Sequence, residues 1–60
     1  MEELTSREIE LLNLLIDTKQ RSKTDDVAAS EIPSIKRTLL NETGFSKYVQ
    51  IMKEIQILLS

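Results

Sequence analysis

The side chains in this 60-residue chain that could do chemistry are mostly basic or amide groups in its middle part. Lys and Arg neutralise phosphates, while Arg can pair bidentately with guanine and Asn with adenine. The candidates for such contacts are polar or basic and lie between positions 19 and 41: Lys19, Arg21, Lys23, Ser34, Lys36, Arg37, Thr38 and Asn41. The alternative is that these groups only solvate a loop and an exposed helix face, as most surface charges do.

Catalytic and metal chemistry have little support in the residue types present. The chain has no His and no Cys, so a nucleophile lacks its usual base and a zinc site lacks its ordinary ligands. The neighbouring acids Asp25 and Asp26 are typical of a helix start, and no glycine-rich phosphate loop or EF-hand spacing occurs. We therefore expect no enzyme, no cofactor and no metal site.

Length and composition indicate one small domain that spans residues 1–60. The formal net charge is −2, and the longest apolar runs are far too short to cross a membrane. The absence of Cys is compatible with a reducing cytoplasm, where we expect the protein to reside, away from membranes. A core this thin gains no disulfide or metal, so oligomerisation is the expected source of additional stability.

The clearest structural signal is the stretch from Leu4 to Ile16. Thr5 and Glu8 have the spacing of a capping box, in which each side chain bonds the backbone N–H of the other residue. Leucines and isoleucines follow at helical spacing and leave polar residues on the opposite side. The pattern predicts a first helix from about residue 5 to residue 20.

Further helix boundaries are marked by capping residues, a proline and the single glycine. Thr24 is a second N-cap candidate, and Pro33 is typical of a first helical turn because its missing N–H needs no partner there. Residues 27–29 can therefore form one or two short helical turns after Thr24, and we expect a separate helix over residues 33–42. Gly44 suits a helix C-terminus with positive φ, from which Phe45 folds back on the helix, and Ser46 is the expected cap of a helix over 47–59.

These signals predict a compact all-α domain of three main helices, with a short fourth helix as an alternative. The last helix has a wider apolar face than one small domain can cover. Its three final apolar residues, Ile57, Leu58 and Leu59, are the expected contact with another chain, most simply in a homodimer.

The residues Leu4-Thr5-Ser6-Arg7-Glu8-Ile9-Glu10-Leu11-Leu12 resemble the opening helix of LuxR-type helix-turn-helix domains, which typically begin L-T-x-R-E-x-E-V-L. Residues 34–37 fall where that family has T-V-K in its recognition helix, and residues 44–46 resemble the family's L-G-V-S before its fourth helix. The I-A-x-x-L pattern of the family's supporting helix is absent between residues 23 and 29. The resemblance implies a helix-turn-helix-like fold and DNA recognition by the 33–42 helix.

Three functions are therefore open from the sequence, the last of them a purely structural subunit of an assembly. The first is a homodimeric, cytoplasmic, DNA-binding transcription regulator that contacts duplex DNA through the candidates between Lys19 and Asn41. The second is a small adaptor or inhibitor that binds a protein partner through its apolar C-terminal helix.

Overall fold

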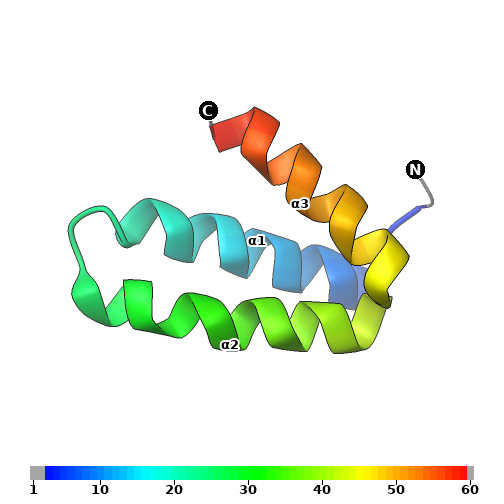
Figure 1. The fold of residues 1–60 in the computed structure, drawn as a ribbon, viewed down its shortest axis with the longest axis horizontal. Coiled ribbons are helices and arrows are strands. Elements are labelled where there is room, and N and C mark those ends of the chain that lie inside the picture. Colours follow the sequence, from blue (N-terminus) through cyan, green and yellow to red (C-terminus); the bar gives the residue numbers. More distant parts are fainter. Residues whose placement is uncertain (1–2, 60) are drawn as a thin grey trace.

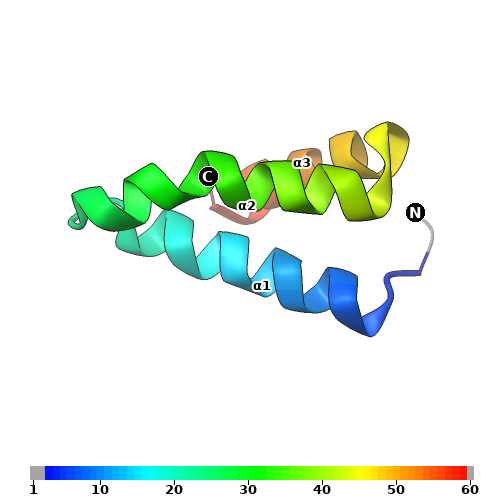
Figure 2. The same ribbon diagram turned by 90° about the horizontal axis from the view of Figure 1, so that it is seen from below.

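The computed structural model describes residues 3–59, whose regular structure consists of three helices: α1 (Ser6–Arg21), α2 (Asp26–Thr43) and α3 (Phe45–Leu59). Helices α1 and α2 lie side by side and antiparallel, and α3 crosses this hairpin on one side (Figure 1). Seen from below, α3 lies behind α2 and ends near the middle of the hairpin (Figure 2). The predicted all-α, three-helix class is confirmed.

The capping box at the start of α1 is present as predicted. The Thr5 backbone N–H donates to Glu8 Oε1 at 2.9 Å, and the Glu8 backbone N–H donates to Thr5 Oγ1 at 3.2 Å. Two backbone donors at the helix start are thereby satisfied. The helix ends at Arg21, one residue later than predicted.

The second helix starts one residue later than predicted, because Asp25 and not Thr24 is its N-cap. Asp25 Oδ1 accepts the backbone N–H groups of Val27 and Ala28 at 2.9 and 3.3 Å. Its backbone is extended, as an N-cap residue requires, and its carboxylate lies at the positive end of the helix dipole.

The predicted break before Pro33 is wrong, because α2 is one continuous helix with Pro33 inside it. The segments expected to be a short helix and a separate recognition helix are therefore joined, and no turn separates them. Pro33 cannot donate to the carbonyl of Ala29, but both residues are exposed, so water can reach that carbonyl. Ala28 before the proline and Ile35 after it are both buried, so burial on both sides favours an unbroken helix.

Gly44 alone connects α2 to α3, and its φ of 84° confirms the predicted positive value. Phe45 does not fold back on Leu40 as predicted but is 68% exposed. Ser46 is not a cap, because α3 already begins at Phe45. The Gly44 carbonyl accepts the Tyr48 N–H at 3.0 Å, so the glycine ends one helix and starts the next.

The core is a single cluster with members on all three helices: Leu11, Leu15, Ile35, Leu39, Ile51 and Ile55. Leu15 and Leu39 have no exposed surface, which places the centre of the core between α1 and α2. Helix α3 covers this seam with its buried isoleucines. Within residues 3–59, no helix combines the length and the apolar content that crossing a membrane requires.

Replacing Pro33 by Ala should stabilise the protein. Alanine restores the donor for the Ala29 carbonyl, and Pro costs about 3 kcal/mol relative to Ala inside a helix. We expect a melting temperature roughly 10 °C or more above wild type, measured by circular dichroism. The neighbouring exposed substitution Ser34→Ala is the matched control and should change the melting temperature little. A Pro33→Ala protein that melts at or below the wild-type temperature would contradict this account.

Candidate functional site

An ion pair between Glu8 and Lys47 fixes the start of α3 against the start of α1. Lys47 Nζ donates to Glu8 Oε1 at 2.9 Å, and both side chains are largely buried. Lys47 also donates to the backbone carbonyl of Glu3. The hydrogen bond from Lys47, followed by that from the Thr5 backbone, lowers the pKa of the Glu8 carboxyl. Glu8 therefore stays charged and both caps α1 and anchors α3.

A second ion pair closes the same end of the hairpin. Arg7 Nε contacts both carboxylate oxygens of Glu42, at 3.1 and 3.2 Å, which joins the beginning of α1 to the end of α2. The ion pairs that join different helices within residues 3–59 therefore lie at the end of the molecule where α3 begins. The ion pair of Arg21 with Asp17, in contrast, lies within α1.

Helix α3 is less well covered toward its C-terminal end. Ile51 and Ile55 are each 1% exposed, yet Leu58, which lies three residues after Ile55 on the same side of the helix, is 68% exposed. Figure 1 shows α3 diverging from α1 in this direction. Leu58 thus belongs to the inner stripe of α3 by its register but has little of the hairpin beneath it.

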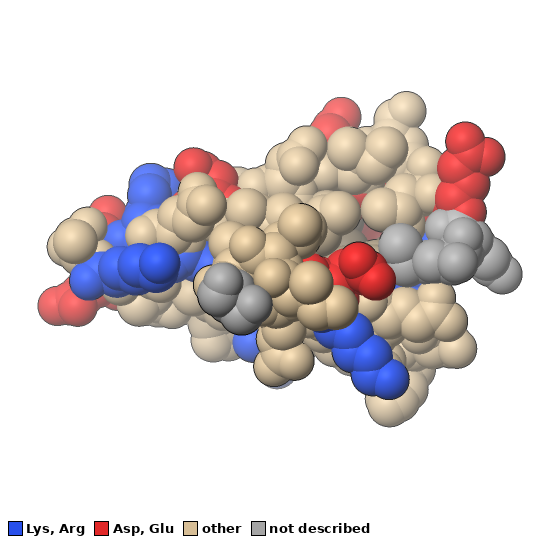
Figure 3. Space-filling view, turned by 90° about the horizontal axis from the view of Figure 1, so that it is seen from above, with Lys and Arg blue, Asp and Glu red and all other residues tan. Residues whose placement is uncertain are grey.

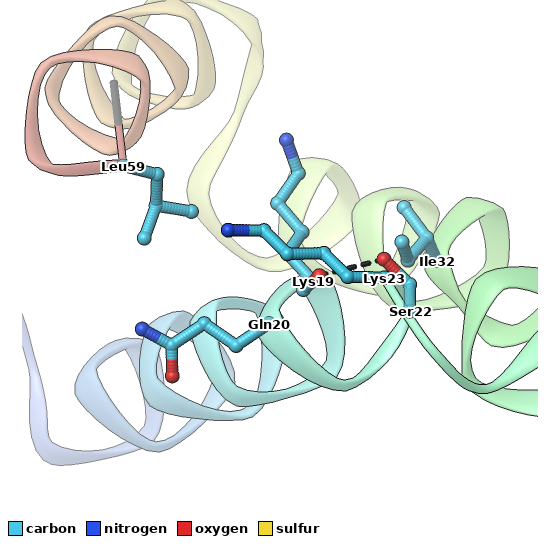
Figure 4. A pocket seen from close by; sticks show the side chains of 6 residues that line it. All are labelled: Lys19, Gln20, Ser22, Lys23, Ile32 and Leu59. Atoms are coloured by element: carbon cyan, nitrogen blue, oxygen red, sulfur yellow. Dashed lines mark hydrogen bonds between the residues drawn. The ribbon is translucent and has the colours of Figure 1, made fainter.

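A hollow of about 330 Å³ lies where α3 and the hairpin separate. We call it the basic groove, and its lining comes from all three helices and the α1–α2 turn: Lys19, Gln20, Ser22, Lys23, Ile32 and Leu59. In Figure 4 the side chains of Lys19 and Lys23 extend into the space between Ile32 and Leu59. The groove therefore combines apolar walls with two ammonium groups.

Neither lysine of the basic groove has a carboxylate partner within residues 3–59. The ion pairs of that range involve Arg7, Arg21 and Lys47, not Lys19 or Lys23. The Ser22 hydroxyl donates to the Lys19 carbonyl at 2.6 Å, which holds the turn in place beside the groove. Seen from above, basic side chains group toward the α1–α2 turn with acidic ones beside them (Figure 3).

The residues predicted to contact DNA are distributed over α1, the α1–α2 turn and α2. Lys19 and Lys23 line the basic groove, whereas Arg21 pairs with Asp17 at 3.1 Å. The remaining candidates are on α2, where Ser34, Arg37 and Asn41 are exposed and Lys36 and Thr38 are half-buried. A second hollow, of about 300 Å³, is bordered by Pro33, Ser34, Arg37 and Thr38, and the Thr38 hydroxyl donates to the Ser34 carbonyl at 3.1 Å.

The residues predicted to form a dimer contact differ in exposure. Ile57 and Leu58 are each 68% exposed, while Leu59 is half-buried and packs against the core. Their role in dimerisation stays a prediction. The sequence did not indicate that Gln20, Ser22 and Ile32 would line one hollow together with the two lysines.

Neither potential metal ligands nor comparison with known proteins indicates a further site in the part of the chain that the structure describes. No group of three or more potential metal ligands occurs within the described range. No protein-family model, curated protein or solved structure matches this chain. The basic groove and the adjoining end of α3 combine exposed apolar side chains with two ammonium groups.

Replacing Glu8 by Gln should lower stability in a pH-dependent way. Because the folded-state pKa of Glu8 is lowered, its charged form stabilises the fold above the ordinary glutamate value of about 4.3. This contribution is lost as pH falls through the lower, folded-state pKa. The melting temperature of Glu8→Gln should therefore lie below wild type at pH 7, and the gap should narrow toward pH 3.

Glu31→Gln is the control, because the exposed Glu31 side chain makes no ion pair or hydrogen bond within residues 3–59. It should melt close to wild type at both pH values. A gap for Glu8→Gln that stays constant between pH 7 and pH 3 would show that the charge of Glu8 does not stabilise the fold.

Proposed function

We propose that this chain is a protein-interaction module that docks through the C-terminal half of α3 and the basic groove beside it. The observation that carries the proposal is Leu58, which continues the stripe of Ile51 and Ile55 but is 68% exposed. A helix surface whose core-facing stripe is uncovered is suited to receive another element of structure.

The apolar surface at this end of α3 is large relative to so small a domain. Ile57 and Leu58 adjoin each other in the chain, and Leu59 next to them lines the basic groove. Covering one such side chain completely is worth about 1.5–3 kcal/mol. A partner that buries this end would therefore add substantially to the stability of a domain of about 60 residues, which is ordinarily marginal.

Two kinds of protein partner fit this proposal: a different protein and a second copy of the chain. A homodimer places the same patch of both copies together and is the commonest form of self-association. Both kinds would cover Leu58. The absence of Cys accords with a cytoplasmic setting for the module.

A DNA-binding regulator is the second candidate function, favoured by one observation on α2. Arg37 has no ion-pair partner within residues 3–59, and its exposed side chain lies beside Ser34 and Thr38 at the hollow next to Pro33. DNA binding is the weaker candidate because acidic residues near the α1–α2 turn offset the basic ones. Three acids, Asp17, Asp25 and Asp26, occur in the same stretch as the three basic residues near the α1–α2 turn.

Photo-cross-linking in cells tests the interaction module. With p-benzoylphenylalanine at position 58, ultraviolet light should join the chain to a second polypeptide. Val27 is the control position, because it is 67% exposed and does not line the basic groove. The mass of the adduct distinguishes a second copy from another protein. Equal adduct yields at positions 58 and 27 would rule out the end of α3 as the docking surface.

A mobility-shift titration on mixed duplex DNA tests the second candidate. Contacts of Lys19, Lys23 and Lys36 with phosphates should make the affinity fall steeply as salt is raised. Arg37→Ala should relax sequence preference by about 1–3 kcal/mol, whereas Lys23→Ala should weaken all sequences alike. If no shift appears at low salt and micromolar protein, the DNA-binding proposal is to be abandoned.

A further inference from the structure

We propose that the basic groove binds an acidic amphipathic helix of a different protein. This inference rests on the proposed interaction function and specifies the chemistry of the partner. The helix would place apolar side chains against Ile32 and Leu59 and carboxylates beside Lys19 and Lys23. It would extend the apolar core beyond Ile55, to the part of α3 where Leu58 is exposed.

The apolar part of the argument comes from the direction of α3. The hairpin extends beyond Leu59 toward the α1–α2 turn, and no helix within residues 3–59 covers that part of it (Figures 1 and 2). Ile32 of α2 lies in this uncovered part and is only half-buried. A partner helix laid across this part of the hairpin would cover Ile32.

The charged part of the argument comes from the two lysines. Lys19 and Lys23 extend their ammonium groups into the same hollow, over apolar walls and without a carboxylate partner within residues 3–59 (Figure 4). Burying them beneath an uncharged partner would remove their hydration with no compensation. Carboxylates at the edges of a docked helix would supply that compensation and would also speed association.

A second copy of this chain fits the groove less well than an acidic helix. If two grooves met about a symmetry axis, the lysines of both copies would be brought together. If instead the outer face of α3 entered the groove, it would bring Lys53 together with Glu54, which leaves the two groove lysines without net compensation. Charge complementarity therefore favours a partner whose docking helix is richer in acids than α3.

Binding of two designed peptides, measured by fluorescence anisotropy, tests this assignment. Both are helices of about 14 residues, ~21 Å long, with the same Leu stripe, and they differ only in carrying Glu or Lys beside it. The Glu peptide should bind wild type roughly tenfold more tightly than the Lys peptide, as expected for two partly exposed ion pairs. Raising the salt from about 0.05 to 0.5 M should reduce this preference.

Charge reversal in the groove supplies the decisive variant. Lys19→Glu with Lys23→Glu should reverse the preference in favour of the Lys peptide. Arg37→Glu with Lys53→Glu changes the net charge equally but alters no residue of the groove lining, so it should keep the wild-type preference. The single variant Lys23→Glu, at an exposed turn position, should lose most of the preference if the double variant does not fold.

The proposal is overturned if neither peptide binds, if both bind wild type equally, or if the control variant loses the preference as the groove variant does. Sedimentation that shows a dimer which Leu58→Asp dissociates would likewise replace the acidic helix with a second copy. Each of these results leaves the interaction module intact as long as cross-linking at position 58 gives an adduct. A missing adduct would instead remove the interaction function itself.

Discussion

Packing of α1 against α2 is the interaction on which the rest of the structure depends. Leu15 and Leu39 are completely buried in this seam, and α3 has no other surface on which to place Ile51 and Ile55. Helix α2 also continues without a break through Pro33, although a proline in a helix interior ordinarily breaks or bends it. Helix α3 thus packs on the α1–α2 hairpin, and its direction makes the two ends of the hairpin differ in how well they are covered.

The two ends of α3 are held very differently, and this difference produces the candidate site. At its start, Lys47 pairs with a carboxylate that is already committed to capping α1. At its other end, Leu58 is exposed and Leu59 borders a hollow that contains Lys19 and Lys23. A small domain that closes its core at one end and leaves apolar and cationic groups together at the other has a surface that another protein can complete.

Local signals were predictable from the sequence, and long-range consequences were not. The Thr5–Glu8 capping box and the positive φ of Gly44 depend on a few neighbouring residues, and both were predicted correctly. Pro33 was misread because burial of the helix on either side of it outweighed its local preference for a first turn. The basic groove could not be foreseen, since it exists only through the angle at which α3 leaves Gly44. Lys19 and Lys23 were recognised as candidates, but their apolar surroundings were not.

The conformation of Gly44 has a consequence for chirality. Its φ of 84° and ψ of 161° are close to the mirror image of the extended backbone that ordinary residues favour, and no described residue other than its two chain neighbours comes within 4 Å of where a Cβ would be. The obstacle to a side chain here is therefore handedness, not space. A D-amino acid would adopt this backbone without strain, while also having fewer conformations available in the unfolded chain. The protein therefore places its one achiral residue at the corner between α2 and α3, where the backbone has a conformation typical of a D-amino acid.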